Sequence, residues 1–241
     1  MLYLIGIGLN NKKDITINGL ETVKKCDLVY LEDYTSKMQV SINELEKLYN
    51  KKIILADRNI VENEFAGILK KNKNKDIALL IIGDVFSATT HIHLILECKK
   101  LGIRYKIINN ASVINAVGIT GLELYKFGKI TSIPFDNENI KTPIEVLKNN
   151  LKLNLHTLFL LDLDPKNNKF MAINEAIKYL INNKINKNTK AVACCALGSE
   201  DELIGYNSLE KLEKQKFNKF PQCLIIPGKL HFVEEEMLRS Y

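Results

Sequence analysis

The sequence predicts an α/β protein with two domains, a Rossmann-like parallel sheet followed by a mixed sheet. Short apolar runs alternate with amphipathic helical patterns along the chain, which is typical of βα units. The 241 residues provide enough material for two domains of about 100 to 130 residues each. Because the pattern restarts after Asn110, we predict domains at residues 1–110 and 111–241.

Five apolar runs predict the strands of the first domain: Leu2 to Ile7, Leu28 to Leu31, Ile53 to Ala56, Ile77 to Ile82 and Tyr105 to Ile108. A helix with an apolar face is predicted after the first strand, around Ile17 to Val23, and Asp14 or Thr16 is its expected N-cap. Val61, Phe65 and Leu69 recur at helical spacing and predict a second helix.

The second domain follows the same logic. Its predicted strands lie at Thr157 to Leu161, Lys190 to Cys195 and Leu224 to Ile226. Helices are predicted between these strands, at Ile173 to Ile181 and Leu203 to Leu212. In the first of them, Ile173, Ile177, Leu180 and Ile181 share one helical face.

Composition excludes several classes of protein. Apolar residues make up 46% and charged residues 26% of the chain, which is typical of a folded domain. The net charge of +6 comes from scattered Asn/Lys-rich segments, which favours solvated loops over a nucleic-acid surface. No apolar run approaches the roughly 20 residues needed to span a bilayer, and the opening residues lack the basic region of a signal peptide. Five cysteines without a CxxC pair favour buried thiols, so we expect a cytoplasmic protein.

The first strand ends in "GIG", which superficially resembles a dinucleotide-binding loop. Asn11 occupies the position of the third glycine, so the amide cradle for a pyrophosphate is incomplete. An oxidoreductase that binds nicotinamide or flavin stays open as an alternative. A tight turn that merely requires glycine also explains the pattern.

The segment "GDVFSATTH" follows the fourth strand, at the sheet edge where open α/β folds bind ligands. Asp84 can accept hydrogen bonds there, and the backbone from Val85 to Ser87 can approach a ligand. The alternative is an Asp turn followed by a Ser or Thr N-cap. His91 and His93 would face apart on a helix, which disfavours a metal site.

Polar residues after other strands are further candidates. "LEDYTS" places Glu32, Tyr34 and Thr35 beyond the second strand, as a polar loop or as a substrate rim. Ser112 is expected to cap a helix. His231 follows a Pro-Gly turn, where a structural role is the ordinary explanation.

Six segments, in order along the chain, resemble the diphthine synthase family of the tetrapyrrole methylase class. They are "LYLIGIGLNNKKDITINGLE", "VYLEDYTS", "GDVFSATTHIHL", "NASVINAVGITGLELYKFGK", "HTLFLLDL" and "IIPGKLH". The segments "ATTH", "AVGITGL" and "YKFGK" are specific to this family, whereas the wider class shares only the fold and the Gly-Asp loop.

The resemblance implies an S-adenosylmethionine-dependent methyltransferase that releases S-adenosylhomocysteine. It further implies a homodimer with the active site in the cleft between two α/β domains. The implied substrate is translation elongation factor 2, on which successive methyl transfers modify the amine of a 3-amino-3-carboxypropyl-histidine. Eukaryotic members also esterify the carboxylate. The resemblance implies neither binding to a membrane nor direct binding to nucleic acid.

By family motif, eight residues would line the cofactor: Leu9, Asp84, Ser87, Ser112, Val113, Leu161, Leu197 and Gln222. The chain departs from the family where Val85 replaces proline, Ala196 arginine, Leu197 alanine and Gln222 histidine.

Methyl transfer needs a neutral amine, a desolvated site and alignment more than an acid–base pair, and we name no catalytic base. Six residues are candidates for contacting the protein substrate: Glu32, Tyr34, Thr35, His91, Lys126 and His231. Lys126 suits the substrate carboxylate by charge. A ribosomal RNA methyltransferase of the same fold, and a binding module without activity, stay open beside the oxidoreductase.

Overall fold

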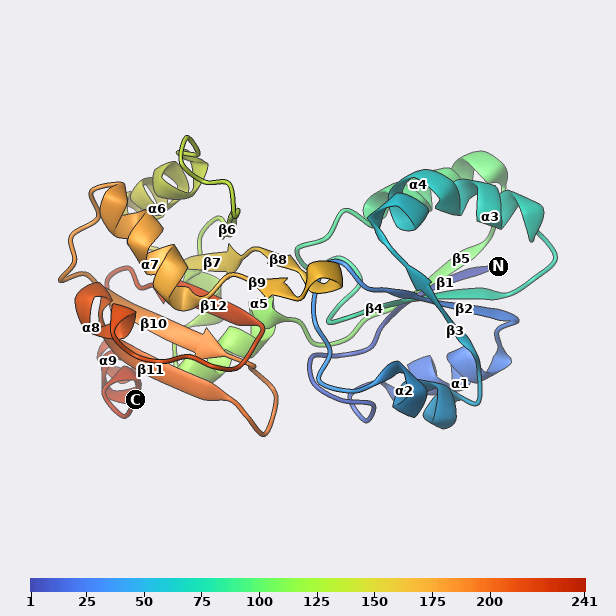
Figure 1. Cartoon of the computed structure of the whole chain (residues 1–241), viewed down its shortest axis with the longest axis horizontal. Coiled ribbons are helices and arrows are strands. Elements are labelled where there is room, and N and C mark those ends of the chain that lie inside the picture. Colours follow the sequence, from blue (N-terminus) through green and yellow to red (C-terminus); the bar gives the residue numbers. More distant parts are fainter. The chain divides into compact units, whose positions relative to one another are not determined.

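The computed structural model describes all residues from Met1 to Tyr241. They form two compact units, the first comprising Met1–Ile114 and Pro165–Asn167, the second Asn115–Asp164 and Asn168–Tyr241. Each unit is a sheet covered by helices (Figure 1). The predicted fold class, with a parallel sheet and a mixed sheet, is confirmed. The predicted division into domains at residues 1–110 and 111–241 stays a prediction.

The sheet of the first unit has the strand order β3-β2-β4-β1-β5, and all its pairings are parallel. Its strands are β1 (Leu2–Gly6), β2 (Leu28–Glu32), β3 (Ile53–Ala56), β4 (Ile77–Ile81) and β5 (Tyr105–Ile108). The central strand β4 is buried along its whole length, because helices cover both faces of the sheet. Parallel pairing brings the carboxyl ends of these strands to one edge.

Two helices pack on each face of this sheet (Figure 1). Helices α1 (Ile17–Lys25) and α2 (Ile42–Tyr49) lie on one face, with α3 (Phe65–Lys71) and α4 (Ile92–Leu101) on the other. A π-helical turn, η1 (Ile60–Glu64), leads into α3. The Thr16 hydroxyl accepts a hydrogen bond from the Gly19 N–H at 3.0 Å, so Thr16 and not Asp14 is the N-cap of α1.

The sheet of the second unit has the order β11-β10-β12-β7-β6. Only β6 and β7 pair in parallel, and the other neighbours are antiparallel. The strands are β6 (Thr131–Ile133), β7 (Thr157–Leu161), β10 (Lys190–Cys195), β11 (Leu203–Ser208) and β12 (Gln222–Ile226). A two-stranded ribbon, β8 (Leu163–Asp164) with β9 (Lys169–Phe170), flanks the 3-10 turn η4 (Pro165–Asn167).

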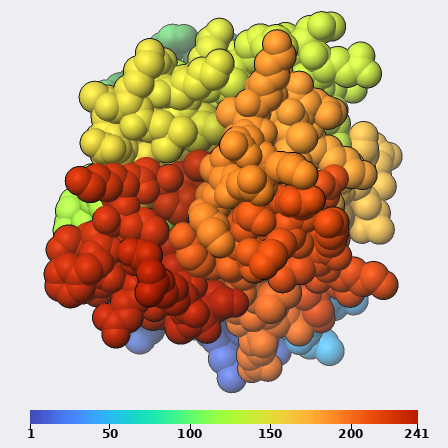
Figure 2. All heavy atoms as spheres, turned by 90° about the vertical axis from the view of Figure 1, so that its left-hand side faces the viewer, coloured from blue at the N-terminus to red at the C-terminus, as the bar shows by residue number.

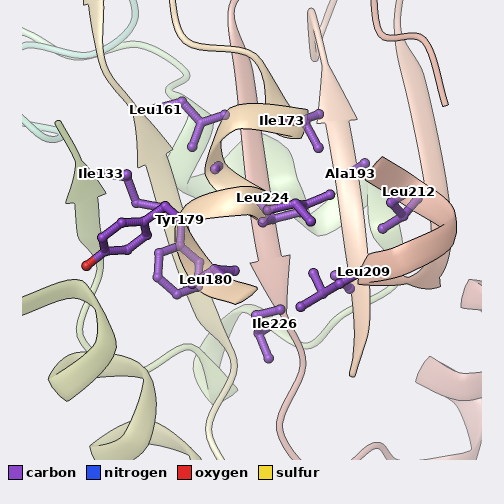
Figure 3. Close-up of a cluster of buried hydrophobic side chains, with 14 of the residues drawn as sticks. Ile133, Leu161, Ile173, Tyr179, Leu180, Ala193, Leu209, Leu212, Leu224 and Ile226 are labelled. Carbon is purple, nitrogen blue, oxygen red and sulfur yellow. The ribbon is translucent and has the colours of Figure 1, made fainter. Parts of the chain in front are cut away.

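The second unit has its own hydrophobic core, to which β7, β10, β12 and the helices α6, α7 and α8 contribute side chains (Figure 3). These helices are α6 (Thr142–Lys152), α7 (Ile173–Asn182) and α8 (Leu209–Glu213). The terminal helix α9 (Phe232–Leu238) lies at the surface of this unit, in red in Figure 2. Three short helical segments follow β5: α5 (Val113–Ala116), which contains the boundary between the units, and η2 (Val117–Thr120) and η3 (Leu124–Lys126), which belong to the second unit.

One predicted element is wrong. Leu203 to Leu212 was predicted as one helix, but residues 203–208 form β11, and only 209–213 are helical. The backbone of β11 pairs with the edge of β10, and this pairing outweighs a helical pattern whose side chains are mostly half-exposed. Of the alternative explanation for the Asp84 segment, the Asp turn is present, but α4 begins behind His91 without a Ser or Thr side-chain cap.

The cysteines and the lengths of the helices can be compared with what the composition leads us to expect. All five cysteines are free thiols and buried. None of the helices has both the length and the apolar character that a membrane crossing requires.

Candidate functional site

The loops after β1, β4 and β5 meet at the carboxyl edge of the first sheet. Gly8 and Gly83 form a two-way bridge, in which the Gly8 N–H donates to the Gly83 carbonyl at 3.2 Å and the Gly83 N–H returns a bond of 2.8 Å. Both glycines have φ near +80°, a backbone conformation that residues with a Cβ rarely adopt. A Cβ at Gly8 would also lie 2.4 Å from the Cβ of Asp14. The pairing of these loops therefore requires glycine at position 8.

The Asp84 carboxylate ties the β4 loop to the β5 loop. Its Oδ1 accepts from the Phe86 N–H at 3.0 Å and the Ser87 hydroxyl at 3.2 Å. Its Oδ2 accepts from the Asn109 amide and the Asn110 N–H, both at 3.0 Å. Burial by itself would raise the pKa of Asp84, but these four hydrogen bonds hold it below its ordinary value. Asp84 is thus an ionised carboxylate that organises both loops.

Asn109 and Asn110 are functional candidates that the sequence reasoning missed. The Asn110 amide donates at 3.0 Å to the carbonyls of Gly6 and Asp14, so it joins the β1 loop to the same network. The available signal was the pair of amide side chains directly after the fifth strand, at the edge where Asp84 had already been selected.

Leu9, Ala111 and Ser112 lie around Gly83. A Cβ built on Gly83 would be in ordinary van der Waals contact with the Ala111 carbonyl at 3.7 Å, the Leu9 side chain at 3.8 Å and Ser112 Cα at 3.9 Å. The Ser112 hydroxyl accepts from the Ile114 N–H at 3.2 Å, and therefore caps the short helix α5 as predicted. The structure thus gathers Leu9, Ser112 and the Asp84 loop around Gly83. Of the other predicted cofactor residues in this unit, Ser87 lies in the Asp84 loop and Val113 follows Ser112.

The three predicted cofactor residues of the second unit share one edge of its sheet. Leu161 ends β7, Leu197 lies just beyond β10, and Gln222 begins β12 opposite Cys195. The Gln222 amide is fully engaged: its oxygen accepts from the Ile173 N–H at 2.8 Å. Its nitrogen donates to the carbonyls of Phe217 and Lys219 at 2.9 and 2.8 Å.

Four predicted substrate-contact residues lie close together in the first unit, but two of them are interior. Glu32 and His91 are both 0% exposed. Glu32 Oε1 accepts from the N–H groups of Tyr34 and Thr35 at 3.1 and 2.6 Å, and its Oε2 accepts from the Thr35 hydroxyl at 2.7 Å. His91 Nε2 faces Glu32 Oε2 at 4.0 Å. Neither side chain is open to a protein substrate in this conformation.

The remaining two candidates, Lys126 and His231, converge on Glu234 in the second unit. The Lys126 ammonium donates to Glu234 Oε2, and to the Lys229 carbonyl at 3.0 Å. The His231 backbone N–H donates to the same Oε2 at 2.7 Å. Lys126 therefore already has a carboxylate partner within its own chain.

His156 and Glu234 complete this cluster, and the sequence reasoning selected neither. His156 Nδ1 accepts from the Gly228 N–H at 3.0 Å, so its Nε2 carries the proton and donates to Glu234 Oε1 at 2.9 Å. Burial lowers the pKa of His156 despite the neighbouring carboxylate. A histidine opening the seventh strand and the "EEE" run of α9 were the only signals, and neither indicates such a contact.

Three comparisons agree with the fold. The family model of tetrapyrrole (corrin/porphyrin) methylases matches residues 1–213. The diphthine synthase of Methanocaldococcus jannaschii is 43% identical and is aligned over 99% of this chain and 98% of its own length. The diphthine methyl ester synthase of Bos taurus is 40% identical, over 100% and 95%. A solved structure of a diphthine synthase superposes with a TM-score of 0.94 at 37% identity, covering 100% of this chain and 95% of that one.

Proposed function

This chain belongs to the tetrapyrrole methylase family and, within it, to the diphthine synthases; we propose on that premise that it methylates a modified histidine of translation elongation factor 2. The methyl donor is S-adenosylmethionine, and the accepting atom is the amine of a 3-amino-3-carboxypropyl group. Full-length similarity at about 40% identity to relatives named for this activity is the observation that carries the proposal.

The carboxyl edge of the first sheet fits a methyl donor of this kind. Gly83 has no side chain there, and Leu9, Ala111 and Ser112 lie around it, so an apolar side chain and backbone groups border this position. Asp84 lies beside it with its carboxylate held ionised by four internal hydrogen bonds. We assign Leu9, Ser87, Ser112 and Val113 to the methyl-donor site, and Asp84 to shaping its loop.

The edge of the second sheet with Leu161, Leu197 and Gln222 is assigned to the same ligand on the family motif. Leu161 and Leu197 offer apolar contact, whereas Gln222 acts through the loop that its amide holds. That the methyl donor lies between the two units stays a prediction.

For methyl transfer the protein has mainly to align the reactants and exclude water. S-adenosylmethionine supplies a methyl group on a sulfonium; a neutral amine attacks this carbon in line, and the thioether S-adenosylhomocysteine leaves. Rigid loops such as those joined by Asp84 and Asn110 can hold the reacting atoms in line, because their backbone is fixed by several hydrogen bonds. No general base is required within the chain, since the proton of the alkylated amine can pass to water.

The partner and location belong to the same proposal. Five free, buried cysteines support a reducing, cytoplasmic location. A homodimer is proposed from the family alone, and size-exclusion chromatography with light scattering tests it.

Calorimetric titration with S-adenosylmethionine and S-adenosylhomocysteine tests the methyl-donor site. We expect micromolar binding by the unmodified protein and at least tenfold weaker binding by Asp84→Ala, because the β4 and β5 loops lose their common anchor. Asp76→Asn is the matched control, since Asp76 lies at the opposite end of β4 and is exposed. Absence of heat with both ligands would remove the proposal.

Transfer of labelled methyl groups to elongation factor 2 bearing the unmethylated side chain tests the substrate. Mass spectrometry of the product counts the methyl groups, and so distinguishes a diphthine synthase from a diphthine methyl ester synthase. Label in ribosomal RNA instead of elongation factor 2 would contradict the assignment of the partner.

A further inference from the structure

A buried pair of ionisable side chains lies between the loops after β2 and β4, and methyl transfer as described above does not use it. Glu32 and His91 are 0% exposed, so neither serves as a direct contact for a protein substrate. The pair belongs to the first unit alone, and its geometry is internal to that unit.

His91 fixes the backbone of the Asp84 loop. Its Nδ1 lies 3.3 Å from the Val85 carbonyl oxygen, and a carbonyl can only accept, so Nδ1 carries the proton. The Thr89 hydroxyl donates to the same carbonyl at 2.8 Å. Two side chains therefore hold Val85, the residue between Asp84 and Phe86.

Glu32 fixes the loop on the other side of the pair. Its carboxyl group accepts three hydrogen bonds from Tyr34 and Thr35, which hold residues 33–35 in a tight turn. The Nε2 of a neutral His91 is an acceptor without a hydrogen-bond partner in the chain. It faces Glu32 Oε2 at 4.0 Å, which is beyond hydrogen-bond distance, so two acceptor atoms oppose each other in the interior. A proton on the Glu32 carboxyl group relieves the repulsion between a carboxylate and this lone pair.

Burial disfavours a charge on either member of the pair. Burial raises the pKa of Glu32, outweighing the three hydrogen bonds that it accepts. Burial also lowers the pKa of His91, although its bond to Val85 and the charge of Glu62 oppose this, while His93 acts in the same direction as burial. The backbone of Tyr34 donates to Glu32, and burial is the main cause that raises the pKa of its hydroxyl.

We propose that His91 is a positioning residue, a neutral Nδ1–H imidazole that fixes Val85 on one side and turns its Nε2 lone pair toward a protonated Glu32 on the other. The pair couples the Gly83–Ser87 loop, the methyl-donor side, to the Glu32–Thr35 loop, for which the sequence offers a substrate rim as one interpretation. This inference rests on the proposed function where it calls one loop the methyl-donor side and the other the substrate side. The tautomer of His91 and the coupling of the two loops do not depend on that function.

Paired substitutions of His91 separate its two nitrogens. In His91→Asn the amide nitrogen replaces Nδ1 and can still donate to Val85, whereas His91→Gln places its amide near Nε2 and loses Val85. We expect the dissociation constant for S-adenosylhomocysteine to change less than about threefold in H91N and to rise about tenfold in H91Q, a loss of about 1.4 kcal/mol. Equal weakening in both variants, at equal thermal stability, would overturn the positioning role.

Glu32→Gln tests the protonated acid. Its amide is uncharged like the protonated acid and places no negative charge opposite His91 Nε2, so we expect E32Q to retain affinity and turnover within about threefold. Glu32→Ala should instead raise the KM for the elongation factor with a smaller change in ligand affinity. An E32Q variant as defective as E32A would overturn the protonated pair. His93→Asn and His93→Gln are controls, because His93 is partly exposed and lies outside the pair.

Nuclear magnetic resonance of the unmodified protein reads the tautomer without any ligand. Long-range proton–nitrogen spectra should show His91 as neutral Nδ1–H at pH 7. A doubly protonated ring or an Nε2–H tautomer would contradict the inference even if the protein binds S-adenosylmethionine. A confirmed tautomer in a protein that binds no methyl donor would leave the pair standing and refute the proposed function.

Discussion

Single carboxylates organise each unit at the residue scale. Asp84 and Glu234 each accept four hydrogen bonds from the chain, and each joins segments that are distant in the sequence. Glu234 brings together the backbone of Glu123, the side chains of Lys126 and His156, and the start of α9. A buried carboxylate is tolerated in such a place because its lone pairs are all satisfied.

The stability of the second unit should depend on Glu234. Glu234→Gln removes the charge opposite Lys126 and replaces one acceptor oxygen by a donor that faces N–H groups. We expect a loss of about 2–4 kcal/mol in the free energy of unfolding, measured by denaturant titration. Glu235→Gln is the matched control, because its exposed carboxylate pairs only with Arg239 and should cost about 0.5 kcal/mol or less.

The same carboxylate predicts a pH dependence. Burial would raise the pKa of Glu234, but hydrogen bonds from Glu123, His231, Lys126 and His156 hold it at about 2. The folded-state pKa lies below that of an unfolded glutamate, about 4.3, so the stabilisation is complete above that pH and is lost as pH falls through about 2. The stability difference between the unmodified protein and E234Q should therefore shrink over this interval, and a constant difference would contradict the assignment.

Side-chain amides join strands to helices at the element scale. Gln222 begins β12, accepts from the first N–H of α7, and donates to two carbonyls of the segment before β12. The N-cap residue of α7 is Ala172, whose side chain cannot accept a hydrogen bond from the first N–H groups of the helix. The start of α7 is thus defined by a residue 49 positions away.

Replacing Gln222 by leucine should loosen this junction. Three backbone groups would lose their partners, and two of these hydrogen bonds are buried, so we expect the free energy of unfolding to fall by about 2–3 kcal/mol. Hydrogen exchange of the Ile173 amide should accelerate more than that of amides in the first unit. Gln215→Leu, at an exposed position nearby, serves as control; an equal effect there would show that the junction is not specific to Gln222.

At the scale of the whole molecule, the chain has separate hydrophobic cores. One cluster lies in the second unit, and two lie on the opposite faces of the first sheet, where Leu79 and Ala78 point to different clusters. Such a molecule gains stability from any ligand that binds only the folded state.

Thermal unfolding should respond to the methyl donor. At a free S-adenosylhomocysteine concentration one hundred times its dissociation constant, we expect an added stability of about 2.7 kcal/mol. Scanning calorimetry at rising ligand concentration measures the shift, and NADH is the control that addresses the oxidoreductase alternative. Stabilisation by NADH without stabilisation by S-adenosylhomocysteine would reverse the choice of ligand.

The sequence by itself determined the strands of the first sheet, three of the five strands of the second, the α/β class and the loop that contains Asp84. These follow from local patterns: buried parallel strands are continuously apolar, and ligand loops of such sheets follow the strand ends. The tertiary structure alone decided that Leu203 to Ser208 is a strand and that His156 meets Glu234. Those outcomes depend on which backbone edge or buried charge lies opposite, and partners far along the chain leave no periodic signal in the residues themselves.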